Sequence, residues 1–217
     1  MKFPNESKAY RAARNRLLSA EKALRRKTEQ VAALRRKLPA GGAVPEDYVF
    51  ESESGPVRLS QLFGMHDTLI ASSFMYGPKA ARPCPMCSSM LDGLNGNARH
   101  IGERAGLVVI AKSPLERIQE FARARGWSNL RLLSSALNNY NRDYHAEDEE
   151  GAQWPMVNVF LRRKGGIRHF WGSELMFAKA ERGQDPRHED IIWPLWNALD
   201  LTPEGRGKWY PGLEPRN

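Results

Sequence analysis

Apolar and polar residues recur along the chain with the periods typical of strands and helices. Residues 68–75, for example, form an apolar run between turn-forming residues, which is typical of a buried strand. The helix expected after residue 113 has an apolar stripe and ends at Gly126. The predicted elements are, in order, a hairpin or extended lead-in at 48–59, a strand at 68–75, a helix at 85–104, a strand at 106–111, a helix at 113–126, a strand at 130–133, strands at 156–161 and 167–171, and a helix at 188–199.

This order of elements predicts an α/β domain. Strands that alternate with helices pair in parallel, whereas the last two strands are joined by a tight turn at 164–166 and pair in antiparallel. The expected architecture is therefore a three-layer fold around a mixed central sheet. Residues 138–151 are polar and acidic, and we expect them to form a surface excursion.

A long N-terminal helix is predicted to precede this domain. Its apolar residues recur every seven positions, at Tyr10, Leu17, Leu24, Val31 and Leu38. Two helical turns take about 7.2 residues, so these side chains lie on one side of the helix. Asn5 or Ser7 can cap its start and Pro39 ends it. We therefore expect a basic arm at 1–40 and a domain at 41–217, with the arm lying on the domain or on a second copy of the chain in a homodimer.

The positive charge of the chain is concentrated in this arm. The 217 residues carry a net charge of +8, and residues 1–40 hold 12 basic and 3 acidic side chains, so the domain itself is close to neutral. A solvated charged face explains such a run, and nothing resembles a base-reading module, which argues against nucleic acid as a partner. No apolar run is long enough to span a membrane and the first residues contain no secretory signal, so we expect a cytoplasmic protein.

The chain has two cysteines, and they lie three positions apart in Cys84-Pro85-Met86-Cys87. A structural zinc site needs four ligands, and the five histidines are scattered. The cysteines could also be two small buried apolar residues, and a static disulfide is disfavoured in a cytosolic chain of this size. The spacing favours a reversible dithiol over these alternatives, with no metal and no bound cofactor.

The position of Cys84 predicts an ionised sulfur. Pro85 suits the first position of a helix, so Cys84 becomes the N-cap, and its sulfur faces the free N–H groups of Met86 and Cys87. A fall in the thiol pKa from about 8.5 to about 7 needs about 2 kcal/mol, near the upper limit of such helix-end effects. Arg82 adds to the effect if it points inward. Cys87, one turn deeper, is the expected resolving thiol.

With these residues in place, the chain resembles the thioredoxin/peroxiredoxin-like superfamily. It is most similar to a family of mostly bacterial proteins described as a thioredoxin-like domain of unknown function with predicted dithiol–disulfide oxidoreductase activity. The segments that carry the resemblance are 74–78, 83–87, 91–94, 141–144, 169–175, 185–188 and 193–196. The likeness spans nearly the whole chain and includes the basic arm.

The resemblance to the wider superfamily implies a proline in cis that faces the dithiol just before a central strand. Trp154-Pro155 fits that place, where the exposed backbone of Trp154 would bind a substrate strand; an ordinary trans proline that opens a strand is the alternative. Two departures from the superfamily follow. Ser72 and Ser73 stand where thioredoxins have a buried Asp, and the segment from Pro78 to Cys84 lacks the peroxidatic signature of peroxiredoxins.

The predicted function is thiol–disulfide exchange. Its partners are a protein or small-molecule disulfide and an external thiol reductant, with Trp154 and Pro155 lining the approach. His169 and Trp171, expected to share one face of a strand, are either packing residues or auxiliary groups beside the dithiol. The alternatives are a peroxidase that uses the same cysteines and a non-catalytic, redox-sensitive module that binds or dimerises through the arm.

Overall fold

The structure is a computed structural model that describes residues 1–183, 193–205 and 207–214. The chain divides into two compact units, Met1–Pro39 and Ala40–Asn217. Two predicted features lie outside the described residues. They are the part of the C-terminal helix at 188–192 and the segment at 185–188 that carries part of the family resemblance. Across the part of the chain that is described, no helix has the length and apolar character needed to span a membrane.

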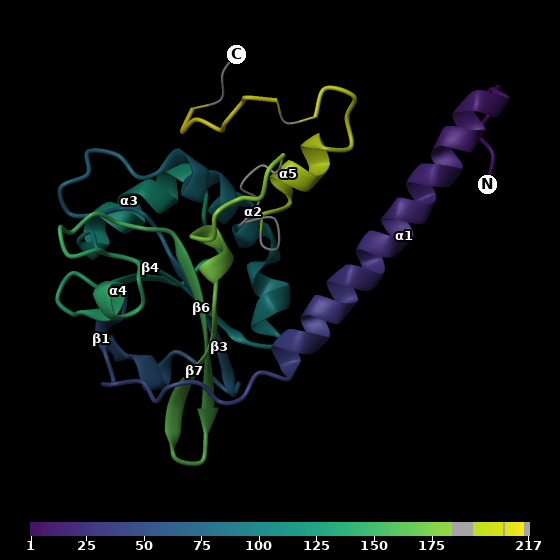
Figure 1. The fold of residues 1–217 in the computed structure, drawn as a ribbon. Helices are drawn as coiled ribbons and strands as arrows, with labels where there is room; N and C mark the ends of the chain where they lie inside the picture. The colour runs from purple at the N-terminus through teal and green to yellow at the C-terminus, as the bar shows by residue number, and fades with distance from the viewer. Residues whose placement is uncertain (184–192, 206, 215–217) are drawn as a thin grey trace. The chain divides into compact units, whose positions relative to one another are not determined.

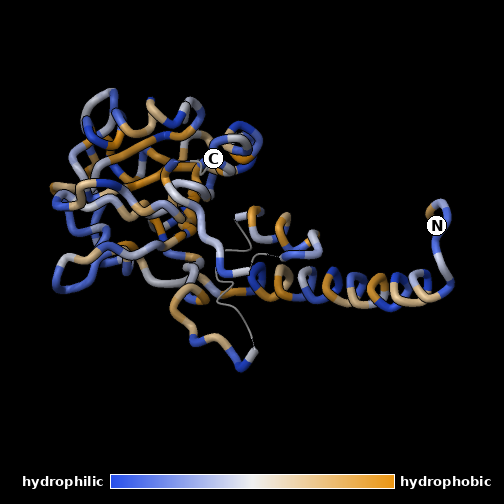
Figure 2. The backbone as a smooth tube through the Cα atoms, turned by 90° about the horizontal axis from the view of Figure 1, so that it is seen from above, coloured by the Kyte–Doolittle hydropathy of each residue, from blue (hydrophilic) through white to orange (hydrophobic). Residues whose placement is uncertain are grey.

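The first unit is built on helix α1, Lys8–Arg36. Ser7 caps it as predicted, since its hydroxyl oxygen accepts a hydrogen bond from the N–H of Tyr10 at 3.1 Å. No residue of α1 is buried. Hydrophobic and hydrophilic positions alternate along it (Figure 2), and three members of the predicted apolar row, Tyr10, Leu17 and Leu24, are 48%, 48% and 68% exposed.

The second unit is organised by a seven-stranded sheet, whose strands β3, β6 and β7 lie side by side in Figure 1. The strands are β1 Val49–Ser52, β2 Gly55–Arg58, β3 Thr68–Ser73, β4 Gly106–Ala111, β5 Leu132–Ser134, β6 Met156–Arg163 and β7 Gly166–Gly172. Their spatial order is β2-β1-β5-β4-β3-β6-β7. β3, β4 and β5 are parallel and the other neighbours antiparallel, which confirms the predicted mixed sheet.

Helices cover the sheet on both faces. They are α2 Pro85–Gly102, α3 Leu115–Arg125, α4 Tyr140–Asp143 and α5 Pro194–Leu199, with the 3-10 turns η1 Leu59–Gln61 and η2 Glu174–Met176. β4 shows the two faces clearly: Val109 and Ala111 pack with residues of α2, α3 and α5, whereas Val108 and Ile110 pack with residues of η1 and α4. A strand buried on both faces is apolar throughout, as the sequence of β4 is.

A β-bulge in β7 changes which residues share a face. Phe160 of β6 pairs with His169, but its neighbour Val159 pairs with Trp171, so Phe170 is an extra residue. Paired residues of adjacent strands point to the same face, and neighbours within a strand point to opposite faces. The prediction that His169 and Trp171 share a face is therefore wrong.

Residues 138–151 differ from the predicted surface excursion. They contain α4, whose Tyr140 is completely buried against the rings of Tyr48 and Phe50. The Tyr48 hydroxyl also donates to the Asp143 carboxylate at 2.5 Å. The polar composition of this stretch conceals an aromatic anchor, and Ala146 after α4 is also buried, so the expectation of a surface excursion is correct only in part, as for the exposed residues 149–151.

Removal of residues 1–39 should leave the second unit folded, because α1 buries none of its residues. The thermal midpoint of the 40–217 fragment should differ from that of the full chain by less than about 4 °C, the shift that about 1 kcal/mol produces in a domain of this size. Circular dichroism measures the midpoint, and loss of the cooperative transition would contradict the expectation. Light scattering on the same two proteins tests the predicted homodimer, since pairing through α1 requires the fragment to be monomeric.

Candidate functional site

The two cysteines lie at the start of α2, after the loop that follows β3. Hydrogen bonds hold this loop at both ends: the N–H of Phe74 donates to the carbonyl of Ile110 at 2.8 Å, and the N–H of Cys84 donates to the carbonyl of Met75 at 3.1 Å. α2 begins at Pro85, which has no N–H to leave unpaired in the first turn. Cys84 is therefore the N-cap, as predicted.

Arg117 of α3 holds the middle of the same loop. Its guanidinium donates to the carbonyls of Pro78 at 2.9 Å and Ala80 at 2.6 Å, and its central carbon lies 4.8 Å from the centre of the Tyr76 ring. The rigid fork of arginine donors allows one side chain to bind both carbonyls. The role of Arg117 could not be predicted from the sequence, since nothing in its spacing distinguishes it from the other basic residues of α3.

The two thiols differ in exposure. Cys84 is half-buried and Cys87 is only 2% exposed, and both are free thiols. Ser88, one turn after Cys84, donates to the Cys84 carbonyl from its N–H at 3.0 Å and from its hydroxyl at 2.9 Å. Cys84 is thus partly exposed and its backbone is fixed, while Cys87 is buried in the core cluster to which α2 contributes.

The surroundings of Cys84 favour its thiolate. A hydrogen bond from the Cys87 thiol is the largest influence, and the N–H groups of Cys87 and Met86 act in the same direction. Burial opposes them, and together these effects lower the pKa of Cys84 from 9.0 to about 6. The side chain makes no N-cap hydrogen bond of regular geometry, so the amides act through their positive ends more than through one aligned bond.

Trp154 and Pro155 lie at the same end of the sheet as Cys84, namely the end at which β3 finishes. Met156, the next residue, pairs with Ser73 at the end of β3. Trp154 is 44% exposed, and its indole N–H donates to the Asp148 carboxylate at 2.9 Å. No peptide bond in the described residues is cis, so the Trp154–Pro155 bond is trans and the expectation of a cis proline is wrong.

Arg82 is not directed at the cysteine sulfur. Its guanidinium donates to the Glu214 carboxylate at 2.8 Å, and its side chain is 61% exposed. It is not among the groups that lower the pKa of Cys84. The structure therefore places Arg82 beside the site but gives it no part in ionising the thiol.

His169 lies away from the dithiol. It pairs with Phe160, which pairs with Leu69, so it is level with a residue four positions before the end of β3, about 13 Å along the strand. Its ring nitrogen is 2.8 Å from the Asn158 amide oxygen, and burial lowers the pKa of the ring. His169 is packed on the sheet face opposite α2, so the structure does not bring it to the cysteines.

Trp171, by contrast, lies on the face that α2 covers. It pairs with Val159, which pairs with Ile70 in β3. Ile70 lies three residues before Ser73, the last residue of β3, so Trp171 is displaced along the sheet from the end at which the cysteines lie. Trp171 is half-buried. Trp171 therefore lies on the same side of the sheet as the two cysteines but not at the end of the sheet where Cys84 is located.

Ser72 and Ser73 stand at the end of β3. They are 1% and 2% exposed, and neither hydroxyl has a hydrogen-bond partner within the described part of the chain. A hydroxyl cannot act as the carboxylate base that thioredoxins have in this region. Among the described residues, no three His, Cys, Asp or Glu side chains come together in a way that could hold a metal ion.

A family described as "Bacterial protein of unknown function (DUF899)" matches residues 1–214. The chain belongs to this family. A search of the curated proteins gives no match.

Solved structures show similarity to the fold. Peroxiredoxin Q from Xanthomonas campestris is 12% identical over 73% of this chain and 96% of its own, with a TM-score of 0.50. A hypothetical protein from Sinorhizobium meliloti is 18% identical over 81% of this chain and 91% of its own, with a TM-score of 0.44. A surface-exposed lipoprotein thioredoxin from Streptococcus pneumoniae is 13% identical over 67% and 96%, with a TM-score of 0.42. The similarity to peroxiredoxin Q confirms the expected thioredoxin-like fold.

The alkylation rate of Cys84 should follow a pKa of about 6. At pH 7 such a thiol is about 90% ionised, so its reaction with iodoacetamide should rise between pH 5 and pH 7 and then level off. Cys87→Ala should move the midpoint upward, because it removes the hydrogen bond that contributes most to the shift. Cys87→Ser keeps a donor and should move the midpoint less.

Mass spectrometry of the alkylated chain measures the rate, and Cys84→Ser supplies the blank. The chain contains only two cysteines, so no third thiol can contribute. A midpoint near the ordinary thiol value of about 8.5 would show that the helix start does not ionise Cys84.

Proposed function

We propose that this protein is a thiol–disulfide oxidoreductase that uses Cys84 and Cys87 as its redox pair. The observation that supports this most strongly is the pairing of an accessible sulfur of lowered pKa with a second, buried sulfur one helical turn away. The thiolate is the nucleophile of disulfide exchange, and a nearby second thiol allows the exchange to go to completion. The thioredoxin-like fold agrees with such chemistry.

The reaction runs in two displacements. The Cys84 thiolate attacks one sulfur of a substrate disulfide, which forms a mixed disulfide and releases the other substrate sulfur as a thiolate. The Cys87 sulfur then attacks Cys84, passes its proton to the solvent or the leaving sulfur, and releases the second substrate thiol. The substrate gains two electrons, and the chain is left with a Cys84–Cys87 disulfide.

Before the substrate reacts, the Cys84 thiolate is stabilised by the same groups that lower the pKa of this residue. In the second displacement Cys84 is the sulfur under attack, and the hydrogen bond from the Cys87 thiol places the attacking atom beside it. An external thiol reductant must reopen the disulfide after each cycle, and no bound cofactor takes part. Trp154 and Pro155, at the same edge of the sheet, would line the approach of the substrate.

Substitution of each cysteine should stop the reaction at a different point. Cys84→Ser should lower the reduction of a peptide disulfide at least about a hundredfold, because a serine hydroxyl is not ionised at neutral pH and does not exchange with disulfides. Cys87→Ser should react once and then remain as a mixed disulfide with the substrate. Thiol release and the intact mass of the chain measure the two outcomes.

The matched control is Ser89→Ala, which changes a neighbouring residue of α2 and leaves both thiols in place. Full activity of Cys84→Ser, or no activity of the native chain with any disulfide, would refute the proposal. Stopped-flow oxidation by hydrogen peroxide identifies the two alternatives: a rate orders of magnitude above that of a free thiol indicates a peroxidase, and slow oxidation without disulfide turnover indicates a redox-sensitive module.

A further inference from the structure

A groove next to the dithiol has part of its wall formed by the chain's own C-terminal segment. The hollow measures about 690 Å³, and its walls come from the loop before Cys84, from α2 and from α3. The aromatic side chains of Tyr76, Phe121 and Trp127 line it, and so do Leu213 and Glu214 from the C-terminal segment.

Two arginines hold the segment in the groove by different means. Arg125 donates to the carbonyl oxygen of Leu213 at 2.6 Å, a contact that any residue in that place could make. Arg82 donates to the carboxylate of Glu214 at 2.8 Å, a contact that requires an acidic side chain. The residues at the groove thus bind one backbone carbonyl and one side-chain carboxylate of the segment.

Arg125 is itself fixed. Its guanidinium bonds to the carboxylate of Asp92 on α2, and the indole N–H of Trp127 donates to the same carboxylate at 2.7 Å. Asp92 is thereby paired, and the contact with Leu213 uses a donor that remains. This part of the groove does not depend on the C-terminal segment for its shape.

The ion pair between Arg82 and Glu214 is the weaker of the two contacts with the C-terminal segment. The two side chains are 61% and 77% exposed, and an exposed ion pair contributes little and is screened by salt. Arg82 lies two residues before Cys84, so the two Cα atoms are within about 7 Å of each other. An incoming carboxylate could replace that of Glu214 and would then lie close to the reactive sulfur.

We propose that this groove binds an acidic segment of the disulfide substrate, and that the substrate's carboxylate displaces the Glu214 carboxylate from Arg82. The proposal rests on the proposed thiol–disulfide activity. It assigns the substrate class as a disulfide whose cysteine has an Asp or Glu within about three residues along the chain. Arg82 is the residue that selects the charge.

The test compares three peptide disulfides that differ in one charge. The probes are the symmetric disulfides of acetyl-Cys-Leu-Glu-amide, acetyl-Cys-Leu-Gln-amide and acetyl-Cys-Leu-Lys-amide. The native chain should reduce the Glu probe with a kcat/KM about two- to fivefold above that of the Gln probe, the range expected for one exposed ion pair, and the Lys probe most slowly. The preference should disappear in 1 M sodium chloride, where the screening length is about 3 Å.

Three variants of the full chain separate the contributions. Arg82→Gln should abolish the preference, and Arg82→Glu should reverse it in favour of the Lys probe. Glu214→Gln should keep the preference and lower KM for the Glu probe about two- to fivefold, because the competing carboxylate is gone. The three variants change two positions, and both side chains are exposed, so the thermal midpoint should stay the same and serves as the check on folding.

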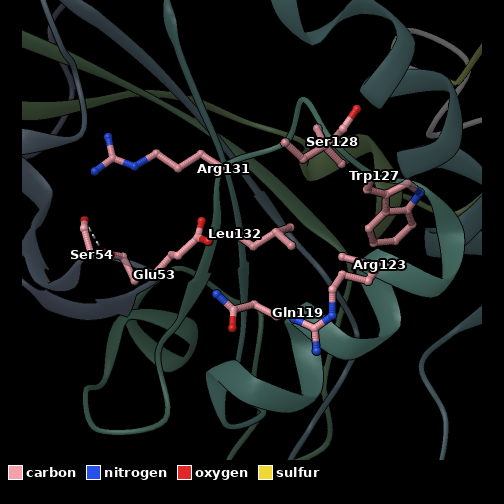
Figure 3. Close-up of a pocket in the computed structure, with 11 residues that line it drawn as sticks. Glu53, Ser54, Gln119, Arg123, Trp127, Ser128, Arg131 and Leu132 are labelled. Carbon is pink, nitrogen blue, oxygen red and sulfur yellow. Dashed lines mark hydrogen bonds between the residues drawn. The ribbon is translucent and has the colours of Figure 1, made fainter.

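The matched control is Arg123→Gln. Arg123 is an exposed arginine of α3, the helix that also carries Arg125, but it lines a separate hollow of about 530 Å³ between α3, β5 and the β1–β2 turn, where Figure 3 shows it apart from Arg131. This substitution should leave the order of the three probes unchanged. Equal kcat/KM for all three probes, or a preference that survives Arg82→Gln, would overturn the groove while leaving the activity intact. Failure to reduce any of the three would overturn the activity and the groove together.

Discussion

The negative charge on one sulfur is the feature on which the rest of the site depends. Cys84 is ionised because a thiol and two backbone amides face it, and those groups are in place only when α2 begins at Pro85. The helix in turn keeps its position because Met90 and Leu91 are buried against the sheet. The packing of Met90 and Leu91 in α2 thus determines the charge of the Cys84 sulfur at the start of the same helix.

The same arrangement influences the direction of the proposed chemistry. Groups that stabilise the Cys84 thiolate stabilise the reduced state of the pair, and they also make Cys84 a better leaving group when its disulfide is attacked. A pair of this kind is reopened by thiols more readily than one with ordinary pKa values. The absence of a carboxylate at Ser72 and Ser73 is consistent with this view, since a thiol that is already ionised near neutral pH needs no base to deprotonate it.

Local signals were enough to predict α2, which carries the cysteines, and β4, which packs with it. The apolar run of β4 and the proline after Cys84 are visible within a few residues, and both elements lie where expected. The bulge at Phe170 could not be predicted, because it depends on how β7 pairs with β6. The burial of Tyr140 likewise depends on Tyr48, far earlier in the chain, so composition alone assigned that stretch to the surface.

The distribution of charge explains why a single exposed arginine can matter at this site. The net charge of +8 resides in the N-terminal arm, and the domain at 41–217 is nearly neutral, so the domain has little overall charge of its own with which to attract one class of substrate. Selection by charge must then come from side chains within a Debye length, about 8 Å at physiological salt, of the reactive sulfur. Arg82 meets that condition through its place in the chain, and its pairing with Glu214 keeps it neutralised until another carboxylate arrives.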